Sequence, residues 1–257
     1  MDNPARRQLL KFLAASPLLY CTAAGRLLAE ESLDAIELPD YLIGSPADAL
    51  DVFDFHAVAK HTLPPAHYGY LATGTDGNET LTANRRAFDQ FYLRPSRMVD
   101  TSRISLETTL LGESLQSPIA LAPVGSQGAF HPDAELATAR AARAQGHLQL
   151  LSNVATTPIE DVIAARGEPV WFQFYPTNQW STAQMMLERA ERAGARVVVL
   201  TVDLNSGSNR VLLGQHERSD DRDCTLCHGA GSVEDFLRMN PMYEGSRTTY
   251  ADFGTPD

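Results

Sequence analysis

A cycle of short apolar runs and helical segments between residues 118 and 203 most constrains how this chain can fold. Each run is mainly apolar rather than alternating, and a segment of helical character joins it to the next. The runs are 118–124, 147–154, 170–175 and 196–203, and the helical segments are 133–146, 159–166 and 182–193. Mainly apolar strands that are joined by helices pair in parallel beneath a helical cover. The sequence therefore predicts an α/β fold with four parallel strands, as in a β/α barrel or an open doubly wound sheet.

Three helical segments are expected before this cycle. Leu63-Pro64-Pro65 is a helix stop after the first of them, and Gly74 to Gly77 forms a turn before the third. The expected helices are 48–59, 66–71 and 79–90. Residues 30–45 are mixed in composition and contain a proline, so we expect a linker there and a folded part that begins near Pro46.

Polar side chains gather where the predicted strands end. The residues concerned are Ser152, Asn153, Gln173, Tyr175, Thr201 and Asp203. In a β/α barrel the carboxyl ends of the strands carry the active site. The sequence therefore places a candidate site at this end of the sheet, with simple capping of the strands as the alternative role for these residues.

Composition excludes several classes of protein. The net charge is −11, and no basic stripe interrupts the acidity, which argues against binding of a nucleic-acid backbone. Hydrophobic residues make up 44% of the chain, which is ordinary for a globular enzyme and not for a disordered protein. Three cysteines are too few for a disulfide scaffold.

The first 29 residues have the features of an export signal. Arg6 and Arg7 precede an uncharged stretch of 14 residues, Phe12 to Gly25, which is too short for a membrane span and contains Pro17. The paired arginines resemble a twin-arginine signal, which predicts an exported, periplasmic protein without a stable membrane span. A short amphipathic helix in a cytoplasmic protein and a retained membrane anchor are the alternatives.

The order and spacing of several motifs resemble one family. The motifs include Thr80-Leu-x-x-Asn84-x-x-Ala-Phe88, Leu121-Ala-Pro123, Glu135-x-Ala-Thr-Ala-Arg140, Trp171-Phe-Gln173-x-Tyr175 and Leu200-Thr-Val-Asp203. Between residues 51 and 210 the chain is similar to the FMN-dependent 2-hydroxy acid dehydrogenases and oxidases, which include glycolate oxidase, lactate dehydrogenase and mandelate dehydrogenase. The resemblance implies a (β/α)8 TIM barrel, of which residues 46–257 hold an N-terminal helical segment and about the first four β-α units.

The resemblance also implies roles for individual residues. Pro123, Val124 and Gly125 would present their backbone to the FMN ring, and Ser152, Gln173 and Thr201 would contact its pyrimidine edge, where polar donors stabilise the reduced flavin. The substrate carboxylate and hydroxyl would be bound by Tyr70, Tyr175 and Arg210. Asp203 would orient a catalytic histidine, so Tyr175 and Asp203 are the candidate catalytic residues.

The implied reaction is the oxidation of a small, lactate-like L-2-hydroxy acid to the 2-oxo acid, in a protein whose intact relatives are homo-oligomers. The family's active-site lysine, its His-Gly-Gly-Arg segment and its phosphate-binding loops do not occur in these 257 residues. We therefore expect an N-terminal half that is inactive alone, with a partner-dependent binding module as the alternative. The substrate, the electron acceptor and the choice between oxidase and dehydrogenase are left open. Val154 and the single Arg210 depart from the family pattern near the substrate.

Cys224-Thr-Leu-Cys227-His228 has the spacing of a c-type haem attachment motif. A haem there would give the flavin an electron acceptor, and the chain would then be an electron-transfer protein. The alternatives are a local disulfide or metal pair, or no cofactor role.

Overall fold

The computed structural model describes residues 40–203, 207–222, 233–248 and 252. Within these residues the chain forms two compact units. The first holds the residues up to Thr62 together with Asn78–Phe91, and the second holds Leu63–Gly77 and the residues from Tyr92 onward. The predicted export signal, most of the predicted linker and the Cys224–His228 motif lie outside the described residues.

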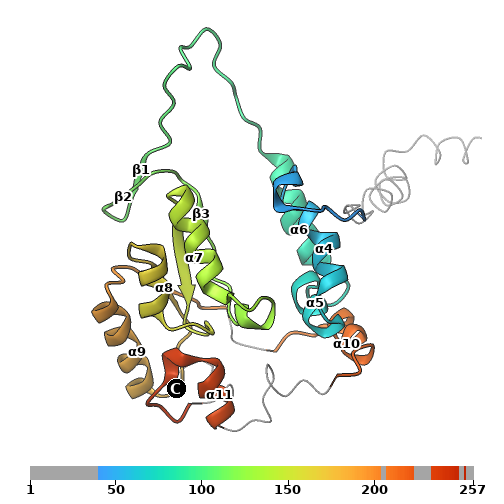
Figure 1. The fold of residues 1–257 in the computed structure, drawn as a ribbon, viewed down its shortest axis with the longest axis vertical. Helices are drawn as coiled ribbons and strands as arrows, with labels where there is room; N and C mark the ends of the chain where they lie inside the picture. Colours follow the sequence, from blue (N-terminus) through green and yellow to red (C-terminus); the bar gives the residue numbers. More distant parts are fainter. Residues whose placement is uncertain (1–39, 204–206, 223–232, 249–251, 253–257) are drawn as a thin grey trace, which may run out of the picture. The chain divides into compact units, whose positions relative to one another are not determined.

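The second unit contains a parallel sheet whose strands follow one another in chain order. The strands are β3 (Ala120–Leu121), β4 (Leu148–Ser152), β5 (Trp171–Phe174) and β6 (Val198–Leu200). Figure 1 labels β3, the first of these strands. The helices that join them are α7 (Ala134–Gln145), α8 (Ile159–Arg166) and α9 (Trp180–Ala193). All three neighbouring pairs are parallel. The four predicted strands and three predicted helices are therefore confirmed, with each strand shorter than the apolar run that predicted it.

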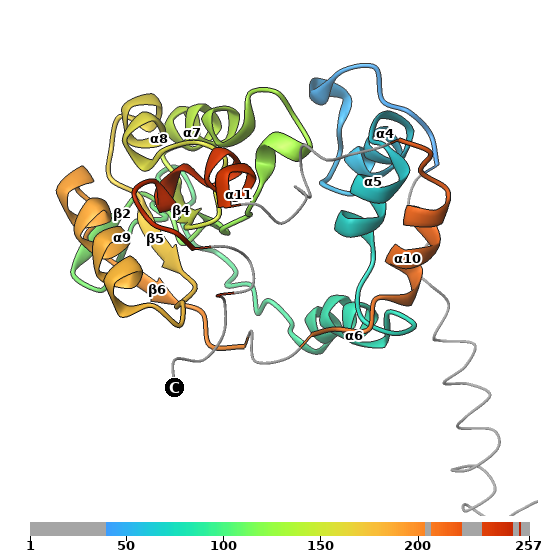
Figure 2. The ribbon, with the colours of Figure 1, turned by 90° about the horizontal axis from the view of Figure 1, so that it is seen from below.

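Helical spacing of the buried residues explains why the helices cover the sheet. In α9, Ala183, Met186 and Ala190 are buried, which places one apolar stripe against the strands. In Figure 2 the helices α7, α8 and α9 follow one another around one side of the strands. The core between them includes Leu151, Val162, Phe172 and Met186.

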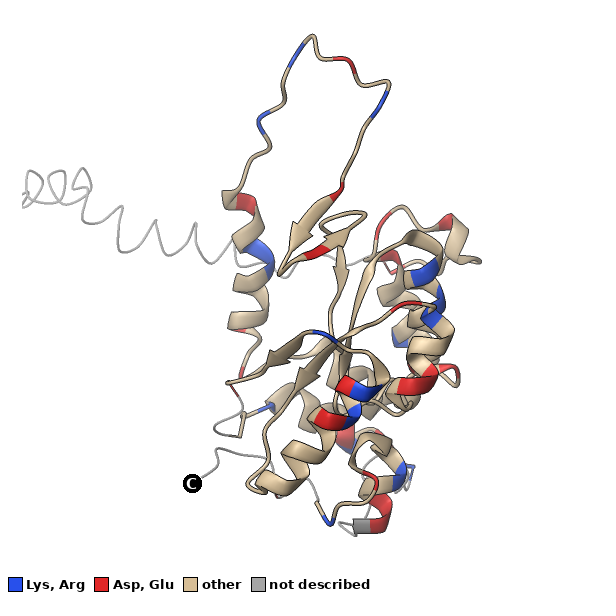
Figure 3. Cartoon of the chain, turned by 90° about the vertical axis from the view of Figure 1, so that its left-hand side faces the viewer, with Lys and Arg blue, Asp and Glu red and all other residues tan. Residues whose placement is uncertain are grey.

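The four strands of the parallel sheet carry no charged side chain. The residues of β3, β4, β5 and β6 include no Lys, Arg, Asp or Glu, as Figure 3 shows by the tan colour of the strands. Strands that are covered by helices are desolvated, and an unpaired charge there would be costly. This distribution is the physical basis of the mainly apolar runs in the sequence.

A β-hairpin that the sequence analysis did not predict precedes the sheet. Strands β1 (Thr108–Leu110) and β2 (Glu113–Leu115) pair antiparallel. The two turn residues, Leu111 and Gly112, both have positive φ, at 52° and 83°. Glu113 accepts a hydrogen bond of 2.7 Å from the Trp171 indole, which ties the hairpin to β5.

Residues 46–91 are mainly helical, as predicted, but the first helix differs from the prediction in its bounds. The helix expected over 48–59 is instead a 3-10 turn, η2 (Pro46–Asp48), and a helix α4 (Asp54–Thr62). The Asp54 carboxylate accepts a 2.6 Å hydrogen bond from the Leu50 amide, and Asp51 accepts one of 2.7 Å from the Phe53 amide. Aspartate side chains that bond nearby amides in this way favour turns over helix.

The other early helices match the prediction closely. They are α5 (Pro65–Ala72), α6 (Glu79–Arg86) and the 3-10 turn η3 (Ala87–Gln90) that continues α6. In the second unit, α5 packs against α10 (Val211–Arg218), which was not predicted. A Cβ on Gly69 would lie 2.5 Å from the Cβ of His216, so only glycine allows this close approach.

A late segment completes the core of the second unit. It consists of α11 (Val233–Met239) and the 3-10 turn η5 (Pro241–Tyr243), and neither was predicted. Phe236, Met242 and Tyr243 belong to the same buried cluster as the strand residues. Within the described residues, no helix is long and apolar enough to cross a membrane.

Replacement of Arg189 tests how this segment is attached. Arg189 donates two hydrogen bonds to the Glu160 carboxylate, at 2.8 and 3.0 Å, and one of 2.6 Å to the Pro241 carbonyl. It therefore joins α8, α9 and η5. Arg189→Met should lower the free energy of unfolding at neutral pH by about 1–2 kcal/mol, measured by urea denaturation.

The same substitution should change the pH dependence of stability. The hydrogen bond from Arg189 is the main cause that lowers the pKa of Glu160 below its ordinary value of 4.5. A carboxyl whose folded-state pKa is lowered stabilises the fold above that ordinary value and loses this contribution as pH falls below it. Arg189→Met should therefore lose less stability below pH 4.5 than the unmodified chain. Parallel pH profiles would contradict the assignment.

Candidate functional site

Three of the predicted cofactor residues come together at the carboxyl ends of adjacent strands. Ser152 at the end of β4 is the register partner of Gln173 on β5. The Gln173 side-chain amide donates a 2.7 Å hydrogen bond to the hydroxyl of Thr201, just after β6. Ser152 and Gln173 are both buried. The structure thus forms a row of three neutral polar side chains across β4, β5 and β6.

The loop after β3 lies against the first member of this row. A Cβ on Gly125 would lie 2.6 Å from Val154 Cγ2 and 3.7 Å from the Ser152 hydroxyl oxygen. The Ser126 amide donates a 2.9 Å hydrogen bond to the Val154 carbonyl. Glycine at 125 therefore lets the backbone of residues 123–126 approach the end of β4 more closely than any other residue would allow.

The hydrogen bonds within this row do not use the hydroxyl hydrogens of Ser152 and Thr201. Ser152 accepts a 3.3 Å bond from the Val154 amide, and Thr201 accepts from Gln173. In the part of the chain that the structure describes, neither hydroxyl hydrogen has an acceptor. Each hydroxyl carries one donor and can accept at the same time, so both hydrogens are available to a polar ligand.

Tyr175 is influenced by two other predicted site residues. Its pKa is raised above 10.0, first by burial and then by the negative charge of Asp203 and by Tyr70. A raised pKa keeps the phenol protonated, and hence a hydrogen-bond donor, through the neutral range. Tyr175 therefore lies within electrostatic range of Asp203 and Tyr70.

Arg210 is held beside Tyr70. Its guanidinium lies 4.7 Å from the centre of the Tyr70 ring and donates a 2.7 Å hydrogen bond to the Tyr70 carbonyl. The same nitrogen also donates to the Thr73 carbonyl at the end of α5. The side chain is thus anchored through one nitrogen, which leaves the other N–H groups of the guanidinium to bind a carboxylate.

Two further buried polar residues, one at a strand end and one on a helix, were given no role of their own in the sequence analysis. Asn153 is fully buried and donates hydrogen bonds to the Tyr175 carbonyl at 3.2 Å and the Tyr243 hydroxyl at 2.7 Å. Glu135, on the first turn of α7, is also fully buried. Glu135 could have been identified from the sequence, because it is a polar residue at a position that the helical period assigns to the core.

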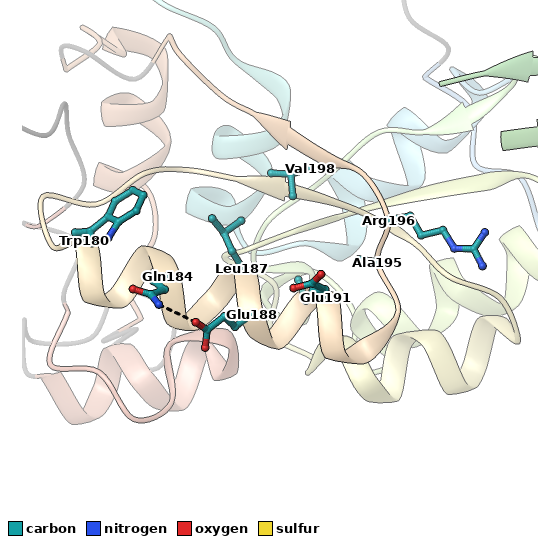
Figure 4. Close-up of a pocket in the computed structure, with 9 residues that line it drawn as sticks. Trp180, Gln184, Leu187, Glu188, Glu191, Ala195, Arg196 and Val198 are labelled. Atoms are coloured by element: carbon teal, nitrogen blue, oxygen red, sulfur yellow. Dashed lines mark hydrogen bonds between the residues drawn. The ribbon is translucent and has the colours of Figure 1, made fainter. Parts of the chain in front are cut away.

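A cavity lies elsewhere in the second unit. It has a volume of about 330 Å³, lies between α9 and β6, and is lined by Trp180, Leu187, Glu188 and Val198 among others (Figure 4). Gln184 on its wall donates a 2.8 Å hydrogen bond to Glu188. None of the predicted site residues lines it. In the described residues no group of three His, Cys, Asp or Glu side chains could hold a metal ion.

Comparison with known proteins decides the family. A sequence model of the FMN-dependent dehydrogenases matches residues 59–225. The chain belongs to this family. Among curated members, glycolate oxidase 1 of Zea mays is 40% identical over 153 residues, which cover 60% of this chain and 42% of the maize protein. The chain therefore spans less than half the length of that relative.

Solved structures of this family share the fold. A lactate oxidase from Pediococcus acidilactici superposes with a TM-score of 0.63 at 29% identity, over 69% of this chain and 48% of that chain. A mandelate oxidase variant, solved with a C4a-OH-FMN adduct, gives a TM-score of 0.60 at 30% identity, over 64% of this chain and 50% of that chain. These relatives are TIM barrels, and the described sheet forms part of such a barrel without closing it. The predicted fold and family are confirmed.

Proposed function

We propose that this chain forms the ring-binding side of an FMN site in an oxidoreductase that converts a small L-2-hydroxy acid to its 2-oxo acid. The observation that carries the proposal is the row of Ser152, Gln173 and Thr201 across three strand ends, with the Gly125 loop against it. The family supports FMN as the cofactor, and the names of its members support a hydroxy acid as the substrate.

The donor set fits the polar edge of a flavin ring. The two unused hydroxyl hydrogens and the Gln173 amide are neutral donors on a nearly charge-free sheet end. Neutral donors can bond the ring carbonyl and ring nitrogens and stabilise negative charge as it develops there. Bound FMN would supply the capacity to accept two electrons from the substrate.

The substrate would lie between this row and the Tyr70, Tyr175 and Arg210 group. Arg210 offers a fixed cation for the carboxylate, and Tyr175 offers a phenol that remains protonated at neutral pH. Asp203 adds a negative charge near Tyr175, suited to stabilise a neighbouring cationic group such as a protonated imidazole.

Gln173→Leu tests the cofactor part of the proposal. Loss of the amide removes one neutral donor, so the dissociation constant for FMN, measured by quenching of flavin fluorescence, should rise by about two- to tenfold. Gln149→Leu is the matched control, since Gln149 is 1% exposed, lies on β4, and has no partner for either side-chain polar atom among the described residues. It should bind FMN as the unmodified chain does. Absence of FMN binding by the unmodified chain would overturn the proposal.

We also propose that residues 1–29 direct export of the folded protein. The support is the pair Arg6-Arg7 before an uncharged stretch that is too short to span a membrane. Cell fractionation should find the protein in the periplasm, and replacement of both arginines by lysine should retain it in the cytoplasm. An identical distribution of the two proteins would contradict the proposal.

A further inference from the structure

The buried carboxylate of Glu135 joins the loops that follow β3 and β4. Its Oε1 accepts hydrogen bonds from the backbone amides of Gln127, at 3.2 Å, and Thr156, at 3.0 Å. Its Oε2 accepts from the hydroxyls of Thr156, at 2.8 Å, and Thr157, at 2.7 Å. The side chain is 0% exposed. Its four partners are neutral donors from two loops that are about 30 residues apart in the sequence.

Further hydrogen bonds extend this link to the proposed cofactor loop. The Gly128 amide donates a 2.9 Å hydrogen bond to the Thr156 hydroxyl, and this hydroxyl donates a hydrogen bond to Glu135. The Gln127 side chain donates to the Val124 carbonyl at 3.3 Å and accepts from Thr138 at 2.7 Å. Val124 and Gly125 are the residues whose backbone is proposed to face the flavin. The carboxylate is therefore connected to that backbone through Gln127.

The loop conformation requires such support. Ser126 has φ of 53°, in the left-handed region that residues other than glycine rarely adopt. A backbone held there is strained, and it persists when the surrounding contacts fix it. The two amides that flank the Cα of Ser126 are both held: the Ser126 amide donates to the Val154 carbonyl, and the Gln127 amide donates to the Glu135 carboxylate. The first turn of α7 also favours a negative charge at Glu135.

We propose that Glu135 is a positioning residue for the cofactor: its carboxylate fixes the 123–128 and 154–157 loops in the arrangement that binds FMN. The inference rests on the proposed function, because it assigns a role to the loops only when FMN binds there. Glu135 itself is buried behind the loops and acts through Gln127, Thr156 and Thr157.

Glu135→Gln tests this role with almost no change in volume. One end of the amide becomes a donor, and it must then face either the two backbone amides or the two threonine hydroxyls. At least one charge-assisted hydrogen bond is lost, so the FMN dissociation constant of the full chain should rise by about three- to tenfold. Amide hydrogen exchange in peptides covering 123–130 and 153–158 should become faster, and the visible circular dichroism of bound FMN at saturation should change.

Glu113→Gln is the control for a merely structural role. Glu113 also accepts one hydrogen bond from a buried side chain, Trp171, and it is not part of the proposed site. This variant should lose stability in urea without any change in FMN affinity, in exchange of the two loop peptides, or in the spectrum of bound FMN. An equal change in both variants would overturn the inference.

A second pair of variants covers the case in which Glu135→Gln does not fold. Thr157→Val removes one hydroxyl donor to Oε2, whereas Thr157→Ser retains it. Thr157→Val should weaken FMN binding, and Thr157→Ser should restore it. Unchanged FMN affinity in Thr157→Val or in folded Glu135→Gln would overturn the inference and leave the proposed function standing. Failure of the unmodified chain to bind FMN would overturn both.

Discussion

Phe172→Ala is expected to lower the free energy of unfolding by about 3–5 kcal/mol. Phe172 is 0% exposed, lies on β5 between β4 and β6, and belongs to the main buried cluster. Truncation removes a large apolar surface from the core. The helices that pack on one side of the sheet prevent the core from collapsing fully into the space that is left. The residual cavity therefore adds to the lost transfer free energy.

Urea denaturation followed by circular dichroism measures this loss. Phe88→Ala is the matched control, because Phe88 is 71% exposed and the same truncation there should change stability by at most about 0.5 kcal/mol. A loss below about 1 kcal/mol in Phe172→Ala would mean that β5 is not at the centre of the core. Gln173 is the next residue on β5, so a different position of β5 would also displace the proposed site.

Gly125→Ala should weaken FMN binding by about 10- to 100-fold, the largest effect expected at the site. The added Cβ would lie 2.6 Å from Val154 Cγ2, which is shorter than any normal contact. Valine is stiff at χ1, so the clash moves the loop backbone away from the end of β4. Overpacking of this kind costs about 1–3 kcal/mol, and that range corresponds to the expected change in affinity.

The double variant Gly125→Ala with Val154→Ala isolates the clash. Removal of the Val154 methyl groups should restore most of the FMN affinity that Gly125→Ala loses. Gly214→Ala is the control: an added Cβ there meets nothing within 4 Å, and in the helix α10 alanine should stabilise by about 0.5–1 kcal/mol. Equal FMN affinities for Gly125→Ala and the unmodified chain would show that the loop does not contact the cofactor.

The sheet and its helices could be predicted because one physical rule governs them. Strands covered by helices are mainly apolar and uncharged, and the helix α8 was predicted at its observed bounds. Gly146 and Gly194 end α7 and α9 with positive φ, as a glycine after a helical segment predicts. The β1–β2 hairpin was missed because Leu111, rather than the usual asparagine or aspartate, occupies a left-handed turn position.

The site was predictable where residue type and strand position agree. Ser152, Gln173 and Thr201 stand at strand ends in the sequence, and parallel pairing brings strand ends to one edge. The role of Glu135 was not predictable, because the sequence shows its place on a helix but not which loops fold onto it. Asn153 was missed as a link to Tyr243 because the two are 90 residues apart.

Hydrogen exchange of the full chain with and without FMN tests the central claim most directly. If the strand ends bind the cofactor, FMN should slow exchange in the peptides that contain Val124 and Gly125, Ser152, Gln173 and Thr201. Peptides of α9 and the start of β6, which line the cavity in Figure 4, should be unaffected. Protection confined to that cavity, or no protection at any of the strand ends, would contradict the account.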